Sequence, residues 1–176
     1  MENSSFYKEN KINRTRRTVL TAVILLVFFL QNTEHLFPRP WGVTAMLLAP
    51  LVICIGMFER ETSGMVFGAA AGALLDAFST QTVCYHTIML AAAGYFSGLL
   101  VTRLIRNNLN SCFLMNVVFL FVYNSLYYLL FYYSPAQENS QYVYFNMYMA
   151  SGLYTAFFIP LFYVIVRAVS KKYRVE

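Results

Sequence analysis

Charged side chains are scarce in this chain. Asp, Glu, Lys and Arg make up only 12% of its 176 residues, whereas hydrophobic residues make up 59%. Soluble domains carry about 25% charged residues, and a soluble domain of this size could not bury so much apolar surface. The composition therefore argues against an ordinary soluble fold and indicates that lipid surrounds much of the protein.

Cysteine and histidine are also few. The three cysteines, Cys54, Cys84 and Cys112, are odd in number and have no paired spacing, which supports neither a disulfide framework nor a metal site. His35 and His86 are isolated from one another. The chain carries no phosphate-binding loop, dinucleotide fingerprint or hydrolase motif. We therefore expect no catalytic residues, no cofactor and no enzymatic activity.

The positive charge follows a membrane pattern. The net charge is +5, but the basic residues lie in short tracts between apolar runs, and no nucleic-acid-binding motif accompanies them. With the N-terminus inside, every one of the 13 Lys and Arg residues except Arg39 falls in an inner segment. Because inner loops of membrane proteins are enriched in Lys and Arg, we expect both termini to be cytoplasmic and no nucleic-acid partner.

Six apolar segments predict an all-α, polytopic membrane protein with six transmembrane helices. Their ranges are about 18–37, 41–58, 63–78, 87–102, 112–133 and 142–166. They form a membrane domain at 18–167, between a basic cytoplasmic tail at 1–17, expected to be disordered or interfacial, and a second basic tail at 168–176. We expect Pro50 and Pro160 to bend their helices, and Thr62 or Ser63 to cap the third helix.

The third segment carries the clearest pattern. Gly64, Gly68 and Gly72, here called the glycine stripe, recur every fourth residue and are followed at the same spacing by Asp76. On a helix this spacing places them on one face, where bare backbone lets another helix approach closely. We expect this helix to be the packing centre of the protein.

The next segment has a matching feature. Gly94 and Gly98 also lie one helical turn apart, so the third and fourth segments are expected to form a closely packed hairpin. The glycines could instead form a homodimer face, and the sequence leaves both possibilities open.

Asp76 is the only acidic residue inside its apolar run. A charge there costs about 2.5–3.5 kcal/mol on insertion scales, and a carboxylate is misplaced near the negative C-terminal end of a helix dipole. It should therefore have a specific partner, although a structural, a partner-binding and a proton-coupling role all remain open. Glu34 is a second carboxylate at similar depth. The candidate partners of Asp76 are Arg39, His35, His86, Gln31 and Asn32.

Residues 64–100 resemble the rod-shape-determining protein MreD family. The matching features are Gly68-x-x-x-Gly72-x-x-x-Asp76, a short loop with Ser79 and Thr80, and a following span with Gly94-Tyr95 and Gly98. The number of spans and the basic N-terminus are also similar to that family. Where the family usually has a glycine about eight residues after its aspartate, this chain has Cys84.

The resemblance implies a multi-pass subunit of the bacterial plasma membrane. Members of the family work with the bitopic protein MreC and, less directly, with the filament MreB, RodA and a class B penicillin-binding protein. They organise lateral peptidoglycan synthesis and cell shape, have no known catalytic activity, and resemble in fold the substrate-binding subunits of energy-coupling-factor transporters.

Two other functions remain open at this stage. A vitamin-binding subunit of an energy-coupling-factor transporter would need an outer pocket, which Tyr127, Tyr128, Tyr148 and Asn124 could line. A membrane enzyme of lipid or wall-precursor metabolism would need clustered ionisable groups at one depth. Only Glu34, His35, Asp76 and His86 approach that requirement.

Overall fold

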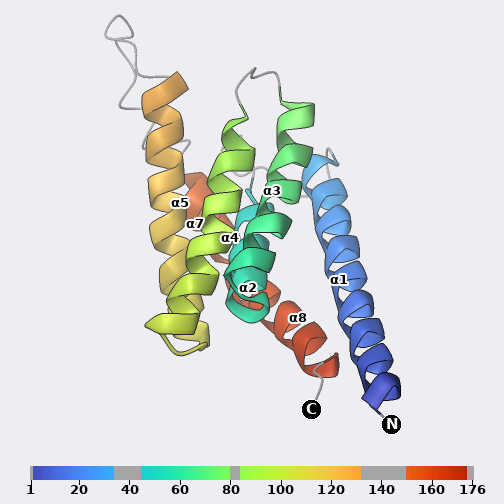
Figure 1. Cartoon of the computed structure of the whole chain (residues 1–176). Coiled ribbons are helices and arrows are strands. Elements are labelled where there is room, and N and C mark those ends of the chain that lie inside the picture. The colour runs from blue at the N-terminus through green and yellow to red at the C-terminus, as the bar shows by residue number, and fades with distance from the viewer. Residues whose placement is uncertain (1, 34–44, 80–83, 132–149, 174–176) are drawn as a thin grey trace, which may run out of the picture.

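A computed structural model describes residues 2–33, 45–79, 84–131 and 150–173, and the regular elements in these ranges are all α-helices (Figure 1). The predicted polar residues Arg39, Glu34 and His35 lie outside the described residues. The helices are α1 (Glu2–Asn32), α2 (Leu48–Glu59), α3 (Glu61–Phe78), α4 (Tyr85–Arg103), α5 (Leu109–Phe131), α7 (Ala150–Ala156) and α8 (Ile159–Lys172).

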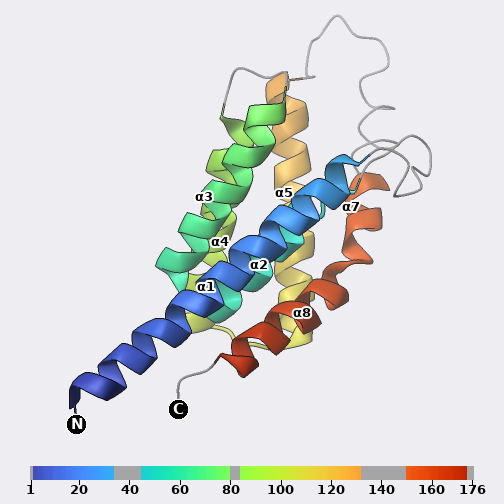
Figure 2. The ribbon, with the colours of Figure 1, turned by 90° about the vertical axis from the view of Figure 1, so that its right-hand side faces the viewer.

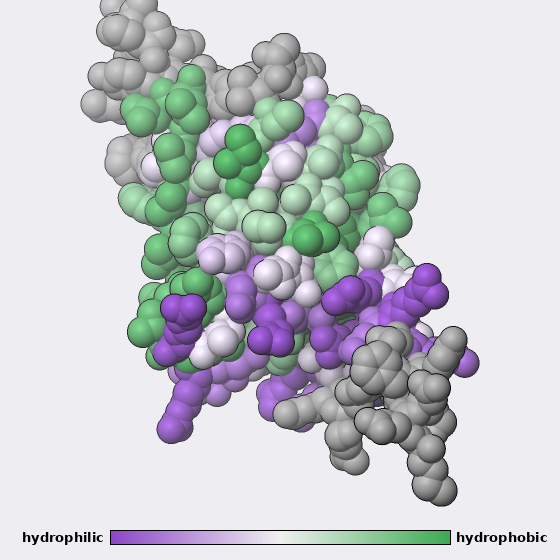
Figure 3. Space-filling view, in the orientation of Figure 1, coloured by the Kyte–Doolittle hydropathy of each residue, from purple (hydrophilic) through white to green (hydrophobic). Residues whose placement is uncertain are grey.

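Successive passes of the chain run in alternating directions between two ends of a bundle, with α7 and α8 together forming the last pass (Figures 1 and 2). At one end, which we call the basic end, α1 begins and α8 ends. The chain also turns at this end from α2 to α3 and from α4 to α5. The opposite end is the Asp76 end. Figure 3 shows hydrophilic side chains gathered at the basic end and a largely apolar surface over the rest of this face.

The N-terminal segment is helical. Residues 1–17 were expected to form a disordered or interfacial tail; residues 2–17 are not disordered, because they continue without interruption into the apolar part of α1, whereas an interfacial position stays a prediction. At 1.5 Å per residue, the 31 residues of α1 extend over about 46 Å, well beyond the roughly 30 Å of a hydrocarbon core. The basic part of α1 therefore projects past the apolar part of the bundle (Figure 2).

The packing centre is α2, not the glycine-rich helix α3 as predicted. Every residue of α2 except Phe58 is buried, and α2 contacts α1, α3, α4, α5 and α8. It contains only 12 residues, which extend over about 18 Å and are too few to cross a bilayer alone. Its sequence is apolar on all sides, as expected of a helix enclosed by other helices.

The junction between α2 and α3 also corrects a prediction. Neither Thr62 nor Ser63 caps α3, because the helix already begins at Glu61. The chain turns at Arg60, which has φ 79° and ψ 164°. Pro50 lies in the first turn of α2, where its missing N–H removes no helical hydrogen bond, so it does not act as an internal kink.

The last pass of the chain is divided as expected from Pro160. α7 ends at Ala156 and α8 begins at Ile159, with Pro160 in the first turn of α8. The proline cannot donate to the carbonyl of Ala156, which removes the hydrogen bond that would have continued the helix. The two pieces point in different directions (Figure 2).

Among the described residues, three helical stretches are long and apolar enough to cross a membrane: Lys11–Asn32 in α1, Leu109–Leu130 in α5, and Ser151–Lys172, which includes both α7 and α8. The two glycine- and alanine-rich helices, α3 and α4, are not among them, and α2 is a shorter apolar helix. The protein therefore has the character of a membrane protein, while the six spans remain a prediction.

Candidate functional site: the Asp76 network and the α3–α4 contact

The glycine stripe lies directly against α4. A Cβ atom added at Gly68 would meet the backbone of Leu90 and Ala91, and one added at Gly72 would lie 2.6 Å from the backbone nitrogen of Thr87. Real Cβ atoms are essentially never found within 3.0 Å of a heavy atom of another helix. Only glycine therefore permits this approach of the two helices.

The glycines of α4 complete the same contact. Gly64 and Gly94 face each other backbone to backbone, and a Cβ added at Gly98 would lie 2.6 Å from the nitrogen of Glu61. Gly56 of α2 also enters the contact, beside Gly94 and Ser97. All the glycines singled out in the sequence thus lie in one interface within the chain. Gly56 was not predicted to lie in this contact, because no second glycine stands one turn away from it.

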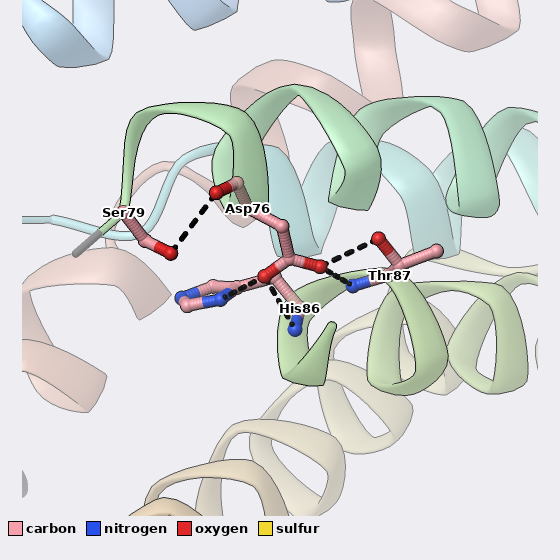
Figure 4. A network of polar contacts seen from close by, with 4 residues as sticks. All are labelled: Asp76, Ser79, His86 and Thr87. Carbon is pink, nitrogen blue, oxygen red and sulfur yellow. Dashed lines mark hydrogen bonds and ion pairs between the residues drawn. The ribbon is translucent and has the colours of Figure 1, made fainter. Parts of the chain in front are cut away.

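Asp76 ends the glycine stripe and joins α3 to the start of α4 (Figure 4). Its Oδ1 accepts hydrogen bonds from the backbone N–H of His86 (3.1 Å) and from His86 Nδ1 (2.8 Å). Its Oδ2 accepts from the backbone N–H of Thr87 (2.8 Å) and from Thr87 Oγ1 (2.5 Å). Since an ionised carboxylate only accepts hydrogen bonds, His86 Nδ1 carries a proton in this arrangement.

The network resolves the expected misplacement of Asp76. His86 and Thr87 are the second and third residues of α4, whose N–H groups have no partner within their own helix. The carboxylate satisfies both groups, as an N-cap residue would, but from a neighbouring helix. It also faces the positive end of the α4 dipole, which offsets its position at the negative end of α3.

Ser79 fixes the chain just after α3. Its backbone N–H and its Oγ both donate to the backbone carbonyl of Asp76, at 3.2 Å and 3.1 Å. One orphan carbonyl at the end of α3 is thereby paired, next to the residue whose carboxylate reaches α4 (Figure 4).

Aromatic rings surround the histidine side of the network. His86 lies against Tyr123 and Tyr127 of α5, and both tyrosines also contact Tyr85. The Tyr85 hydroxyl donates to the backbone carbonyl of Tyr123 at 2.7 Å. The Asp76 network therefore connects α3 and α4 and, through these rings, reaches α5.

The buried start of α2 is capped in a comparable way. The backbone N–H of Leu48 donates to Gln31 Oε1 of α1 at 3.2 Å, and that of Met46 donates to Thr155 Oγ1 of α7 at 3.0 Å. Gln31 was proposed as a partner of Asp76, but the structure uses it here. Asn32, the other proposed neutral donor, donates to the carbonyl of Phe28 in its own helix. Of the candidate partners that lie among the described residues, His86 is the one that binds Asp76.

The basic end has an ion pair that no local sequence pattern predicts. Arg16 Nη2 of α1 lies 2.6 Å from Glu59 Oε2 at the end of α2, and the two side chains are 21% and 2% exposed. Nearby, Asn107 Nδ2 donates to the backbone carbonyl of Met57 at 3.1 Å. Arg16 and Glu59 are both in segments that looked solvent-exposed, and no spacing rule links residues so far apart.

The other side of α4 is different in character. An apolar groove of about 510 Å³ separates it from α5. Its lining includes Ala92 and Phe96 of α4, Val118 and Val122 of α5, and Ile53 of α2. The lining carries almost no polar surface, which does not suit a vitamin and suits lipid or another apolar helix.

Comparisons with family models, with curated proteins and with solved structures give no match for this chain. The geometry of the α3–α4 contact and the sequence pattern that produces it are therefore the basis for a functional proposal.

Proposed function

We propose that the protein is a non-enzymatic integral membrane subunit of the bacterial cell-elongation complex, with the role of an MreD-like protein. In this role it organises lateral peptidoglycan synthesis and cell shape by packing against membrane partners. The partner of first importance is a bitopic MreC-like protein. An MreB-like filament, RodA and a penicillin-binding protein are reached indirectly.

The observation that carries the proposal is the arrangement of residues 64–100. The residues that resemble the MreD pattern are the same residues that make the α3–α4 contact: Gly68 and Gly72 lie against α4, and Asp76 binds its first turn. The pattern therefore has a physical purpose, which is to build a rigid hairpin. A rigid hairpin suits a subunit that positions other proteins.

We further propose that the chain crosses the plasma membrane six times with both termini in the cytoplasm. The alternating direction of the helices and the location of α1's start and α8's end at the basic end support this topology (Figure 1). The short α2 is then accommodated inside the bundle, because the helices around it cover its apolar surface. Two reporters fused to the C-terminus test this topology. The reporter that is active only in the cytoplasm should give a signal, and the reporter that is active only outside the cytoplasm should give none.

Copurification tests the partner. The tagged full-length chain is expressed with an MreC-like protein in the same membrane, extracted in mild detergent, and recovered by its tag. We expect the MreC-like protein to copurify and a bitopic protein with an unrelated transmembrane helix to be lost. Recovery of neither protein, together with tight binding of a small vitamin by the purified chain, would contradict the proposal.

The Asp76→Ala and Asp76→Asn variants test the role of the hairpin. The alanine variant removes every acceptor of the α4 N–H groups, whereas asparagine keeps one carbonyl oxygen. We expect MreC-like protein recovery and rescue of rod shape to fall strongly with alanine and only partly with asparagine. Full activity of a folded alanine variant would show that the carboxylate is incidental to function.

A further inference from the structure

Two cysteines that are far apart in the sequence meet inside the bundle. Cys54 of α2 and Cys112 of α5 are separated by 58 positions, yet their Sγ atoms lie 3.3 Å apart. Both are free thiols and both side chains are fully buried. The third cysteine, Cys84, is exposed at the start of α4. The sequence spacing gave no reason to pair Cys54 with Cys112, because only the fold brings α2 and α5 together.

The surroundings hold Cys112 in place. Asn116, one turn further along α5, donates from Nδ2 to the Cys112 carbonyl at 2.8 Å and lies 3.4 Å from its Sγ. Asn116 is itself fully buried. A disulfide bond has an S–S length of about 2.05 Å, so the two sulfur atoms need to approach by only about 1.3 Å.

We propose that Cys54 and Cys112 form a redox-active dithiol that a quinone dissolved in the bilayer oxidises to a disulfide between α2 and α5. Two S–H bonds break and one S–S bond forms. The two electrons and two protons released pass to the quinone, which becomes a hydroquinone. A quinone suits this site because both thiols lie in the buried core of the bundle and expose no surface to water.

The bond would fix the central helix to α5. Ile53 precedes Cys54, and Met115 follows Cys112 by one turn, and both residues line the apolar groove between α4 and α5. Oxidation therefore sets the position of α5 at one end of this groove, while the Asp76 network at the other end of the bundle is unaffected.

The test uses the full-length Cys84→Ser variant in lipid vesicles containing a fully ring-substituted quinone, which cannot add thiols to its ring. After treatment, free thiols are alkylated under denaturing conditions and counted by mass spectrometry, and peptides are mapped. We expect both thiols to be lost together, with a Cys54–Cys112 crosslinked peptide that disappears on reduction. Adding Cys54→Ala or Cys112→Ala should leave the remaining thiol fully alkylated.

Two results would overturn the proposal. One is that both thiols of the folded protein stay alkylatable with the quinone, while the same chain, once denatured, forms the disulfide with a soluble oxidant. The other is that the folded protein forms the crosslink with a water-soluble oxidant such as diamide but not with the quinone. Peptide mapping of Cys84→Ser itself gives the answer even if an alanine variant fails to fold.

Discussion

The two faces of α4 show two different ways of placing helices side by side. On one face, Gly94 and Gly98 let α3 approach until backbone meets backbone, and Asp76 binds the first turn of α4. On the other face, α4 and α5 are separated by an apolar groove of about 510 Å³ along much of their length. The α3–α4 contact is the most extensive helix pair among the described residues, whereas the α4–α5 contact is slight.

The comparison shows that apolar surface alone does not bring helices together in this protein. Both faces of α4 are largely apolar, but in lipid there is little hydrophobic gain when one helix replaces acyl chains around another. Close packing and satisfied polar groups supply the difference. The face with the smaller side chains therefore makes the larger contact, and the face with the larger side chains is left for lipid or a partner.

The substitution Gly94→Leu, on the α3 face of α4, should cause the largest loss of stability. In Gly94→Leu the new side chain would collide with the backbone of Gly64, which cannot move without displacing the whole of α3. We expect a loss of more than about 3 kcal/mol of stability, seen as a large fall in melting temperature in detergent. An unchanged melting temperature would show that the two helices are not in close contact.

Removal of the Asp76 carboxylate should have the next largest effect. In Asp76→Ala the N–H groups of His86 and Thr87 lose their acceptor in a poorly solvated position, where each unpaired group costs about 1–3 kcal/mol. We expect a loss of about 3 kcal/mol, and about half of that in Asp76→Asn. Equal stability of the two variants would contradict a capping role, since only asparagine retains an acceptor.

Loss of Arg16 should have a smaller effect at the opposite end of the bundle. Arg16→Ala leaves the carboxylate of Glu59 buried without its ion-pair partner, which we expect to cost about 2 kcal/mol. The figure is below that of a fully buried pair because Arg16 is 21% exposed. The double variant Arg16→Ala/Glu59→Gln should recover part of the loss in thermal unfolding. If it is less stable than Arg16→Ala, the buried charge is not the cause.

The substitution Ala92→Leu, on the groove face of α4, should cause the smallest change in stability. Ala92 is two residues from Gly94 and faces the apolar groove, which has room for a larger side chain. We expect Ala92→Leu to change stability by no more than about 0.5 kcal/mol. Ala92→Leu and Gly94→Leu both place leucine on α4. The difference between their losses of stability therefore measures how differently the two faces of α4 are packed. A loss in Ala92→Leu as large as in Gly94→Leu would show that the faces are equivalent.

Local patterns predicted part of the fold. The helical segments, the division of the last pass at Pro160 and the involvement of His86 with Asp76 are consequences of residues close together in the sequence. The four-residue spacing of Gly64, Gly68 and Gly72 is sufficient to place them on one face. The structure then shows which helix that face meets.

The remaining features depend on contacts that no local pattern contains. The central position of α2 follows from its shortness and from the helices around it. The ion pair between Arg16 and Glu59 and the approach of Cys54 to Cys112 join residues more than 40 positions apart. Asp76 was correctly expected to have a partner, but the backbone N–H groups of His86 and Thr87 were not predicted as its donors, because the order of side chains does not show which backbone groups a neighbouring helix presents.

The caps at the start of α2 have a consequence for how the protein is made. Gln31 lies in α1, which precedes α2 in the chain, whereas Thr155 lies in α7, 109 positions after Met46. Until α7 has been synthesised, the N–H of Met46 has no acceptor from it, and the central helix is covered on fewer sides. Assembly of the core around α2 is therefore completed only after α7 has been translated.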